Sequence, residues 1–175
     1  DVQTKSPIYL VHDTASRIKK HFKTYPALSE YIKMVVDRKY NYIISGFLFL
    51  EENQHGVSKH INTTLTDITS DTPFVDIGKN YNHPDFQTVT YVNLPEDLEQ
   101  GVLKIYNTKT GEAVSIPPMN NRLIKFAGDC PHEVSEIKTN SIRITLFTEQ
   151  YNISTEHLTS LRGKLFDSGT LSSVK

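Results

Sequence analysis

The hydrophobic positions follow two different patterns, and the change between them falls near residue 40. Between Thr14 and about Lys39 the apolar residues recur at roughly helical spacing, with Pro26 inside the pattern. Because proline cannot donate a backbone hydrogen bond within a helix, this segment predicts two helices or one kinked helix. The apolar positions that carry the pattern are Ile18, Phe22, Leu28, Ile32, Val35 and Val36.

From Tyr40 onward the apolar segments are short, rich in β-branched and aromatic residues, and separated by turn residues. Eight such segments at close spacing predict a β-sandwich or jelly roll. A further helix is expected around Ser154–Leu161, followed by a frayed tail. The predicted strands are Tyr42–Leu50, Phe74–Ile77, Thr88–Leu94, Val102–Tyr106, Ala113–Ile116, Arg122–Phe126, His132–Ile137 and Ser141–Thr148.

Length and composition indicate one ordinary globular domain over residues 1–175. Helices are expected at about 14–39, the β core at about 40–150, and a C-terminal helix and tail at 151–175. With 19 Lys and Arg against 20 Asp and Glu, the chain has none of the basic excess of a nucleic-acid or membrane-surface binder. No apolar run is long enough to span a membrane. The single cysteine, Cys130, fits a reducing compartment, so we expect a cytoplasmic protein.

His83, Asp85 and His132 are the candidate metal ligands. In a strand, residues two apart point to the same face, so His83 and Asp85 can both point into one cavity. A histidine from a distant strand would complete a set of two imidazoles and one carboxylate. Such a set binds Fe(II) and leaves open coordination positions, as in non-haem iron oxygenases, although zinc accepts the same ligands.

Arg143 is a candidate anion-binding residue. It lies in an alternating segment, Ser141–Leu146, where Arg143 and Thr145 share one face and the apolar residues share the other. A guanidinium that points into a β-barrel requires an anion, because an unpaired buried charge is costly. A carboxylate satisfies it through two parallel hydrogen bonds. The alternative partner within the chain is Glu133.

Several segments, in this order, resemble the catalytic core of 2-oxoglutarate-dependent dioxygenases, and most closely the prolyl hydroxylases. The similarity extends over about residues 81–147. One departure is Gln100, which precedes Gly101 where the family often has two glycines. The segments are Tyr91-Val92-Asn93-Leu94, Gly101-Val102-Leu103-Lys104-Ile105-Tyr106, Asn121-Arg122-Leu123-Ile124-Lys125-Phe126, Pro131-His132-Glu133-Val134 and Arg143.

The resemblance implies a double-stranded β-helix with the N-terminal helices packed on one sheet. It implies that His83, Asp85 and His132 ligate Fe(II), and that Arg143 binds the distal carboxylate of 2-oxoglutarate. Tyr91 and Thr145 are expected to assist Arg143. Oxidative decarboxylation of 2-oxoglutarate would drive hydroxylation of the substrate by O2, and no catalytic side chain beyond the metal ligands is required.

The resemblance leaves the substrate open. The first hypothesis is hydroxylation of an unactivated C–H bond in a prolyl or other residue of a peptide. Others are oxidation of a free amino acid or small metabolite, a non-catalytic β-helix binding module with a relic metal site, and a cupin-like zinc or manganese protein. Tyr91 could instead be a core residue. His55 and His60 are expected in a solvated hairpin, with a mobile loop at the mouth of the site as the alternative, and Cys130 is expected to be structural.

Overall fold

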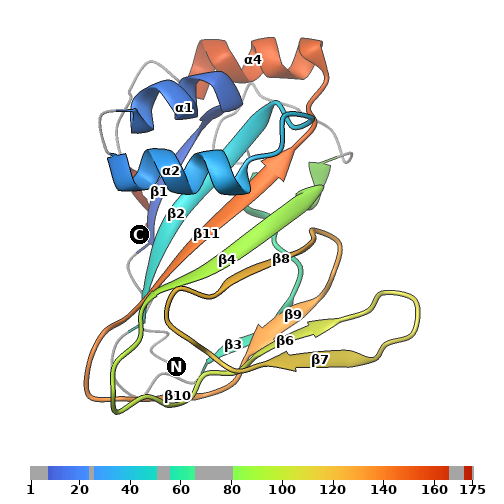
Figure 1. The fold of residues 1–175 in the computed structure, drawn as a ribbon. Helices are drawn as coiled ribbons and strands as arrows, with labels where there is room; N and C mark the ends of the chain where they lie inside the picture. The colour runs from blue at the N-terminus through green and yellow to red at the C-terminus, as the bar shows by residue number, and fades with distance from the viewer. Residues whose placement is uncertain (1–7, 24–25, 51–55, 66–80, 166–171, 175) are drawn as a thin grey trace.

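Two antiparallel sheets form the body of the protein (Figure 1). The computed structural model describes residues 8–23, 26–50, 56–65, 81–165 and 172–174. The larger sheet has the strand order β12-β1-β2-β11-β4-β8, the smaller has the order β3-β9-β6-β7, and β5 pairs with β10. The strands are β1 (Ile8–Thr14), β2 (Tyr42–Leu50), β3 (Val57–His60), β4 (Phe86–Asn93), β5 (Glu99–Gln100), β6 (Leu103–Tyr106), β7 (Ala113–Ile116), β8 (Leu123–Ala127), β9 (His132–Val134), β10 (Ile137–Lys138), β11 (Arg143–Tyr151) and β12 (Ser172–Val174).

The chain passes back and forth between the two sheets. It runs from β2 in the larger sheet to β3 in the smaller and returns to β4 in the larger. It then crosses to β6 and β7 in the smaller sheet, returns to β8 in the larger, crosses to β9 in the smaller and comes back to β11 in the larger. This alternation is the winding of a double-stranded β-helix, so the predicted mainly β jelly-roll fold is confirmed. It places strands that are distant in sequence, such as β3 and β9, side by side in the same sheet.

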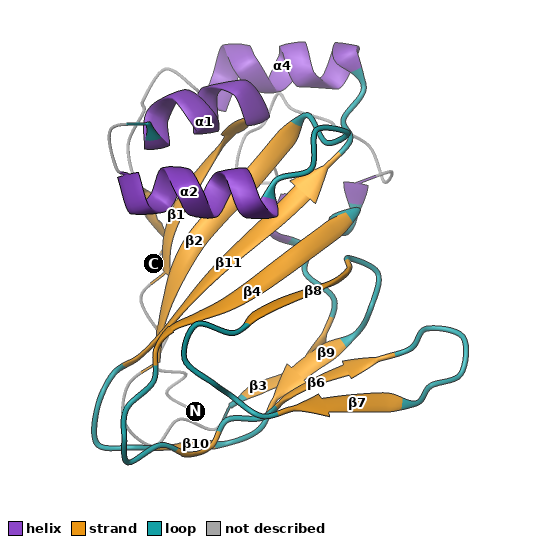
Figure 2. Ribbon diagram, in the orientation of Figure 1, coloured by secondary structure: helices purple, strands orange, loops and turns teal. Residues whose placement is uncertain are grey.

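The first two helices cover the outer face of the larger sheet, as Figure 2 shows. The predicted helical segment forms two helices, α1 (Ala15–Phe22) and α2 (Pro26–Val35). Pro26 is the first residue of α2, a position where the missing N–H has no cost and the fixed φ favours the helix. A third helix, α4 (Thr155–Leu165), follows β11 and begins one residue after the start of the predicted segment. None of the described helices is long and apolar enough to cross a membrane.

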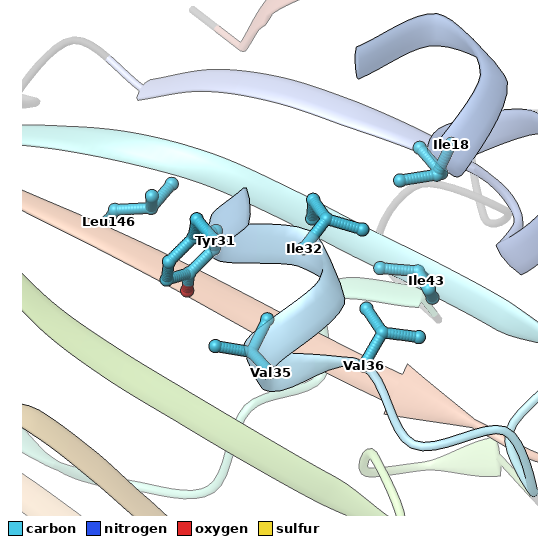
Figure 3. Close-up of a cluster of buried hydrophobic side chains, with 7 residues drawn as sticks. All are labelled: Ile18, Tyr31, Ile32, Val35, Val36, Ile43 and Leu146. Atoms are coloured by element: carbon cyan, nitrogen blue, oxygen red, sulfur yellow. The ribbon is translucent and has the colours of Figure 1, made fainter. Parts of the chain in front are cut away.

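The helices attach to the sheet through an apolar cluster with a polar anchor (Figure 3). The cluster joins α1 and α2 to β2 and β11. Within it the Tyr31 hydroxyl lies 3.0 Å from the Thr148 hydroxyl on β11 and 3.3 Å from that of Thr88 on β4. These contacts fix the outward face of β11, so by alternation its other residues point between the sheets. The buried members are Ile18, Tyr31, Ile32, Val35, Val36, Ile43 and Leu146.

A second core lies between the two sheets. Side chains of β4 and β8 from the larger sheet pack there against β6, β7 and β9 from the smaller one. Its buried members are Tyr91, Leu103, Ile124 and Phe126. This apolar layer surrounds the inward-facing residues of β4 and β11, so any polar group among them is kept from water.

Four strands were not predicted, namely β1, β3, β5 and β12. The predicted strand Phe74–Ile77 lies outside the described residues. Part of the expected tail, Ser172–Val174, forms β12 and pairs with β1 at the edge of the larger sheet. Of these elements β3 matters most, because it supplies side chains to the candidate site.

Candidate functional site

Arg143 begins β11 and points into the space between the sheets, where its side chain is 2% exposed. One guanidinium nitrogen, Nη1, donates to the carbonyl of Gly101 at 3.1 Å, but Nε has no partner. Within the described residues no carboxylate forms an ion pair with it. Glu133, the alternative partner, instead pairs with Lys104 at 3.3 Å and accepts a hydrogen bond from Tyr106. Burial lowers the pKa of Arg143, yet an arginine remains charged in a protein.

Two hydroxyls without partners accompany the guanidinium. Thr145 is the register partner of Tyr91 across β11 and β4, and both side chains are buried. The Tyr91 hydroxyl and the Thr145 hydroxyl make no hydrogen bond, and the Arg143 guanidinium carbon lies 4.9 Å from the centre of the Tyr91 ring. Burial raises the pKa of Tyr91, partly offset by the charge of Arg143, so the phenol keeps its proton and can donate it.

Buried polar groups in folded proteins nearly always have partners, so a cluster of groups without them requires an explanation. Five buried side-chain atoms in the described structure lack a hydrogen bond, and three of them belong to Arg143, Tyr91 and Thr145. All three can donate, and one carries a positive charge. A carboxylate placed among them would satisfy every one of these donors.

The loop before β6 lies against the guanidinium of Arg143. Gln100 and Gly101 both have positive φ, at 67° and 74°. A Cβ at position 101 would lie 2.6 Å from Nη1 of Arg143, and the positive φ of Gly101 disfavours any other residue there. Gln100 adopts the left-handed conformation that glycine favours. The loop and Arg143 therefore form one unit.

A second polar cluster lies in the smaller sheet. His60 at the end of β3 is the register partner of His132 at the start of β9, and the two ring centres are 4.4 Å apart. His132 is buried and packs edge-on against Phe126 at 5.3 Å. Burial, together with the neighbouring His60, lowers the pKa of His132 to about 4, so this imidazole is neutral near pH 7. The expectation of a solvated hairpin at His60 is therefore wrong, because β3 pairs with β9.

Hydrogen bonds at Nδ1 orient both imidazoles in the same way. His132 donates from Nδ1 to the carbonyl of Cys130 at 3.1 Å, and His60 donates from Nδ1 to the carbonyl of Ser58 at 2.7 Å. A carbonyl only accepts, so Nδ1 carries the proton in each ring. A neutral ring then presents the lone pair of Nε2, which is the arrangement that metal-ligating histidines use.

Two amides extend this cluster toward the larger sheet. Oδ1 of Asn62 lies 3.0 Å from Nε2 of His60, and Nδ2 of Asn62 donates to Oε1 of Gln87 at 2.8 Å. Gln87 is an inward-facing residue of β4, four positions before Tyr91, and its Nε2 has no partner. His60, Asn62, Gln87 and His132 are called the imidazole–amide cluster below. At about 3.3 Å per residue, Gln87 and Tyr91 lie roughly 13 Å apart along the strand.

His83 and Asp85 do not join this cluster. Both are exposed and precede β4, which begins at Phe86. His83 donates from Nδ1 to the carbonyl of Pro84 at 2.9 Å, while the Asp85 carboxylate accepts the backbone N–H of Asn152 at 2.6 Å. Across the described residues no three His, Cys, Asp or Glu side chains gather closely enough to hold a metal ion. The structure therefore does not assemble the predicted triad, and only His132 occupies the interior position expected of it.

The imidazole pair nevertheless fits a divalent metal. Two imidazoles on adjacent strands, each with an Nδ1 proton held by a carbonyl, can supply nitrogen donors to iron. The third donor nearest to them is an amide oxygen and not a carboxylate. Sequence reasoning missed His60, Asn62 and Gln87, since His60-Ile61-Asn62 has the spacing of a His-x-Asp motif but lacks the acid.

Comparison with solved structures identifies the fold. A Pseudomonas putida prolyl-4-hydroxylase superposes with a TM-score of 0.52 at 14% sequence identity, over 87% of this chain and 76% of that one. A 2OG-Fe(II) oxygenase family protein from Burkholderia pseudomallei (TM-score 0.47, 12% identity, 87% and 73% coverage) and a Trichoplax adhaerens prolyl hydroxylase (0.46, 16%, 92% and 69%) are also similar. No family model and no curated protein matches the sequence. The chain therefore has the fold of a prolyl 4-hydroxylase, as the resemblance implied.

Proposed function

We propose that the protein is an Fe(II)- and 2-oxoglutarate-dependent oxygenase. The observation that carries the proposal is the set of buried donors without partners at Arg143, Tyr91 and Thr145. A protein gains nothing in stability from a desolvated guanidinium without an anion, which suggests that a bound carboxylate completes the site. The fold, shared with a prolyl-4-hydroxylase, supports a dicarboxylic co-substrate in this position.

In this proposal the distal carboxylate of 2-oxoglutarate lies against Arg143. The guanidinium supplies the charge, and the Tyr91 and Thr145 hydroxyls donate to the same carboxylate. Removing one partner of such a charge pair, enclosed by the apolar layer between the sheets, costs about 2–5 kcal/mol of binding free energy. The keto-acid end then extends along β4 toward the imidazole–amide cluster, and this direction orients the co-substrate.

The metal belongs at the imidazole–amide cluster. His132 remains a ligand as predicted, and His60 takes the place assigned to His83, because His60 and His132 face each other within one sheet. Iron bound there would couple oxidative decarboxylation of 2-oxoglutarate to oxidation of a substrate, so that O2, 2-oxoglutarate and R–H give succinate, CO2 and R–OH. The protein binds and orients the reactants and excludes water through Phe126 and its apolar neighbours.

The finer proposal concerns the substrate. We propose hydroxylation of an unactivated C–H bond in a prolyl or other residue of a peptide, with a free amino acid or small metabolite as the alternative substrate. The support is the likeness to the Pseudomonas putida prolyl-4-hydroxylase, a similarity of fold. A second candidate function is a non-catalytic module that binds a dicarboxylate. It is favoured by the absence, among the described residues, of an acidic side chain beside the two imidazoles.

Succinate release distinguishes these two functions. Protein incubated with Fe(II), ascorbate, O2 and 2-oxoglutarate is expected to form succinate slowly even without the primary substrate, because the co-substrate and the metal share one cavity. Succinate is quantified by mass spectrometry, with an Arg143→Met variant as the matched control. Binding of 2-oxoglutarate without any succinate above the control would contradict the oxygenase and support the binding module.

A further inference from the structure

We propose that Asp97 is a positioning residue for the co-substrate, because its carboxylate ties together the two loops that hold the Arg143 guanidinium. The inference rests on the proposed role of Arg143 in binding 2-oxoglutarate, and it goes further by naming an exposed residue that controls this buried site. Asp97 lies in the connection between β4 and β6, whereas Arg143 follows the connection between β9 and β11.

The two connections lie side by side at the end of the barrel where β11 begins (Figure 1). β5 in the first connection pairs with β10 in the second, and each strand has two residues. The backbone N–H of Gly101 donates to the carbonyl of Glu136 at 2.9 Å and adds one bond to this pairing. So short a ladder is marginally stable by itself, so the placement of the two loops depends on further contacts.

Arg143 depends on both connections. Its backbone continues from the second connection, and its Nη1 donates to the carbonyl of Gly101 at the end of the first. A shift of one connection against the other would therefore break this bond or move the guanidinium relative to Tyr91 and Thr145. A binding site requires its polar groups to be held within about 0.5 Å, so the relative position of the loops affects affinity.

Asp97 joins the two connections directly. Its Oδ1 accepts from the Thr139 hydroxyl and its Oδ2 accepts from the backbone N–H of Asn140, both at 2.7 Å. The direction of both bonds is fixed, because a carboxylate accepts and a backbone N–H donates. The bond from the Asn140 N–H, followed by that from the Thr139 hydroxyl, lowers the pKa of Asp97, so its carboxylate is charged near pH 7.

Thr139 carries this constraint toward Arg143. Its side chain is buried, and its hydroxyl also accepts from the backbone N–H of Ser141 at 3.1 Å. From the other side, Nδ2 of Asn93 at the end of β4 donates to the carbonyl of Ile142 at 3.2 Å. Every residue of the turn that precedes the guanidinium is thus hydrogen-bonded, and Asp97 accepts two of these bonds.

Calorimetric titration of 2-oxoglutarate into the intact protein at saturating Mn(II) tests the proposal. Asp97→Ala removes both bonds, and we expect its affinity for 2-oxoglutarate to fall about tenfold, the effect that residues supporting a binding group typically have. Thr139→Val is expected to weaken binding in the same direction, whereas Thr139→Ser keeps the hydroxyl and restores it. The double variant of Asp97→Ala and Thr139→Val should lose no more than Asp97→Ala, because both changes remove one shared contact.

A second measurement follows the guanidinium itself. The Nε–H group of Arg143 is buried without a hydrogen-bond partner, and its nitrogen–proton correlation signal in nuclear magnetic resonance is assigned by its loss in Arg143→Met. We expect this signal to shift or broaden in Asp97→Ala. Asp37→Ala is the matched control, because it removes another exposed aspartate that accepts a backbone N–H, that of Lys39 at 3.0 Å. Neither the signal nor the affinity is expected to change in this control.

An unchanged affinity for 2-oxoglutarate or an unchanged Arg143 signal in Asp97→Ala would overturn the proposal. An equal loss of affinity in Asp37→Ala would also overturn it, since the effect would then follow from lower stability in general. The Arg143 signal requires no co-substrate. Absence of 2-oxoglutarate binding by the wild type would therefore contradict the oxygenase proposal, while the signal still decides whether Asp97 positions the guanidinium.

Discussion

Replacing Arg143 with methionine is expected to abolish the response of the protein to 2-oxoglutarate and, at the same time, to raise its melting temperature without ligand. The two effects have one cause. The guanidinium is buried, with a single hydrogen bond to the Gly101 carbonyl and no carboxylate partner among the described residues. Methionine has a similar length and needs no counter-ion, and replacing buried charged groups with apolar ones is often neutral or stabilising.

The expected magnitudes are large enough to measure. Loss of a charge partner enclosed within a site costs about 2–5 kcal/mol of binding, or roughly 30-fold to several thousandfold in affinity for 2-oxoglutarate. For a domain of this size each kcal/mol of stability corresponds to about 2–4 °C. Melting curves with and without 2-oxoglutarate report both effects. Arg122→Met, which changes a half-buried arginine whose guanidinium donates to the Pro117 carbonyl, is the matched control. A variant that melts lower than the wild type and still responds to the ligand would show that Arg143 is structural.

His60→Ala is expected to weaken binding of a divalent metal at least about tenfold, whereas His83→Ala leaves it unchanged. His60 faces the buried His132 across the β3–β9 ladder, while His83 is exposed and bonded to the carbonyl of Pro84. Titration with Co(II), followed by its visible absorption, measures the affinity of both variants.

His132→Ala serves as the positive control, because this residue belongs both to the ligand set predicted from the sequence and to the proposed pair with His60. Each variant changes one histidine to the same residue, so the total imidazole count is matched between His60→Ala and His83→Ala. The opposite pattern, with affinity lost only in His83→Ala, would return the ligand set to His83, Asp85 and His132.

The anion-binding end was predictable from sequence because it depends on local alternation. Arg143 and Thr145 are two residues apart in a long strand with apolar neighbours between them, so their shared face could be read directly. Tyr91 lies in the adjacent strand, and its identification came from the resemblance. In the structure all three side chains are buried and have polar atoms without partners, which is the observation that supports the proposed co-substrate site.

The metal end was not predictable in the same way. The reasoning for His83 and Asp85 assumed strand geometry, but β4 begins at Phe86, so the rule that residues two apart share a face did not apply to them. The true partner of His132 is set by the pairing of β3 with β9, two strands of four and three residues. Short polar segments of this kind carry almost no periodic signal, and their register depends on tertiary contacts.

Asn62 was missed for a chemical reason. A search for metal ligands looks for histidine, cysteine and acidic residues, and an amide two residues after a histidine does not stand out. In the structure its side chain lies between those of His60 and Gln87, within hydrogen-bond distance of both. The terminal strands β1 and β12 were missed for a different reason, since they extend the larger sheet at its edge and lie far from the motif residues.

The central claim is that one cavity has a cationic end at Arg143 and a two-imidazole metal end at His60 and His132. Calorimetric titration of 2-oxoglutarate into the protein, with and without saturating Mn(II), tests it most directly. A co-substrate anchored at both ends must bind more tightly when the metal is present, and we expect a gain of about tenfold or more. Equal affinity with and without Mn(II), or no binding in either case, would contradict the account.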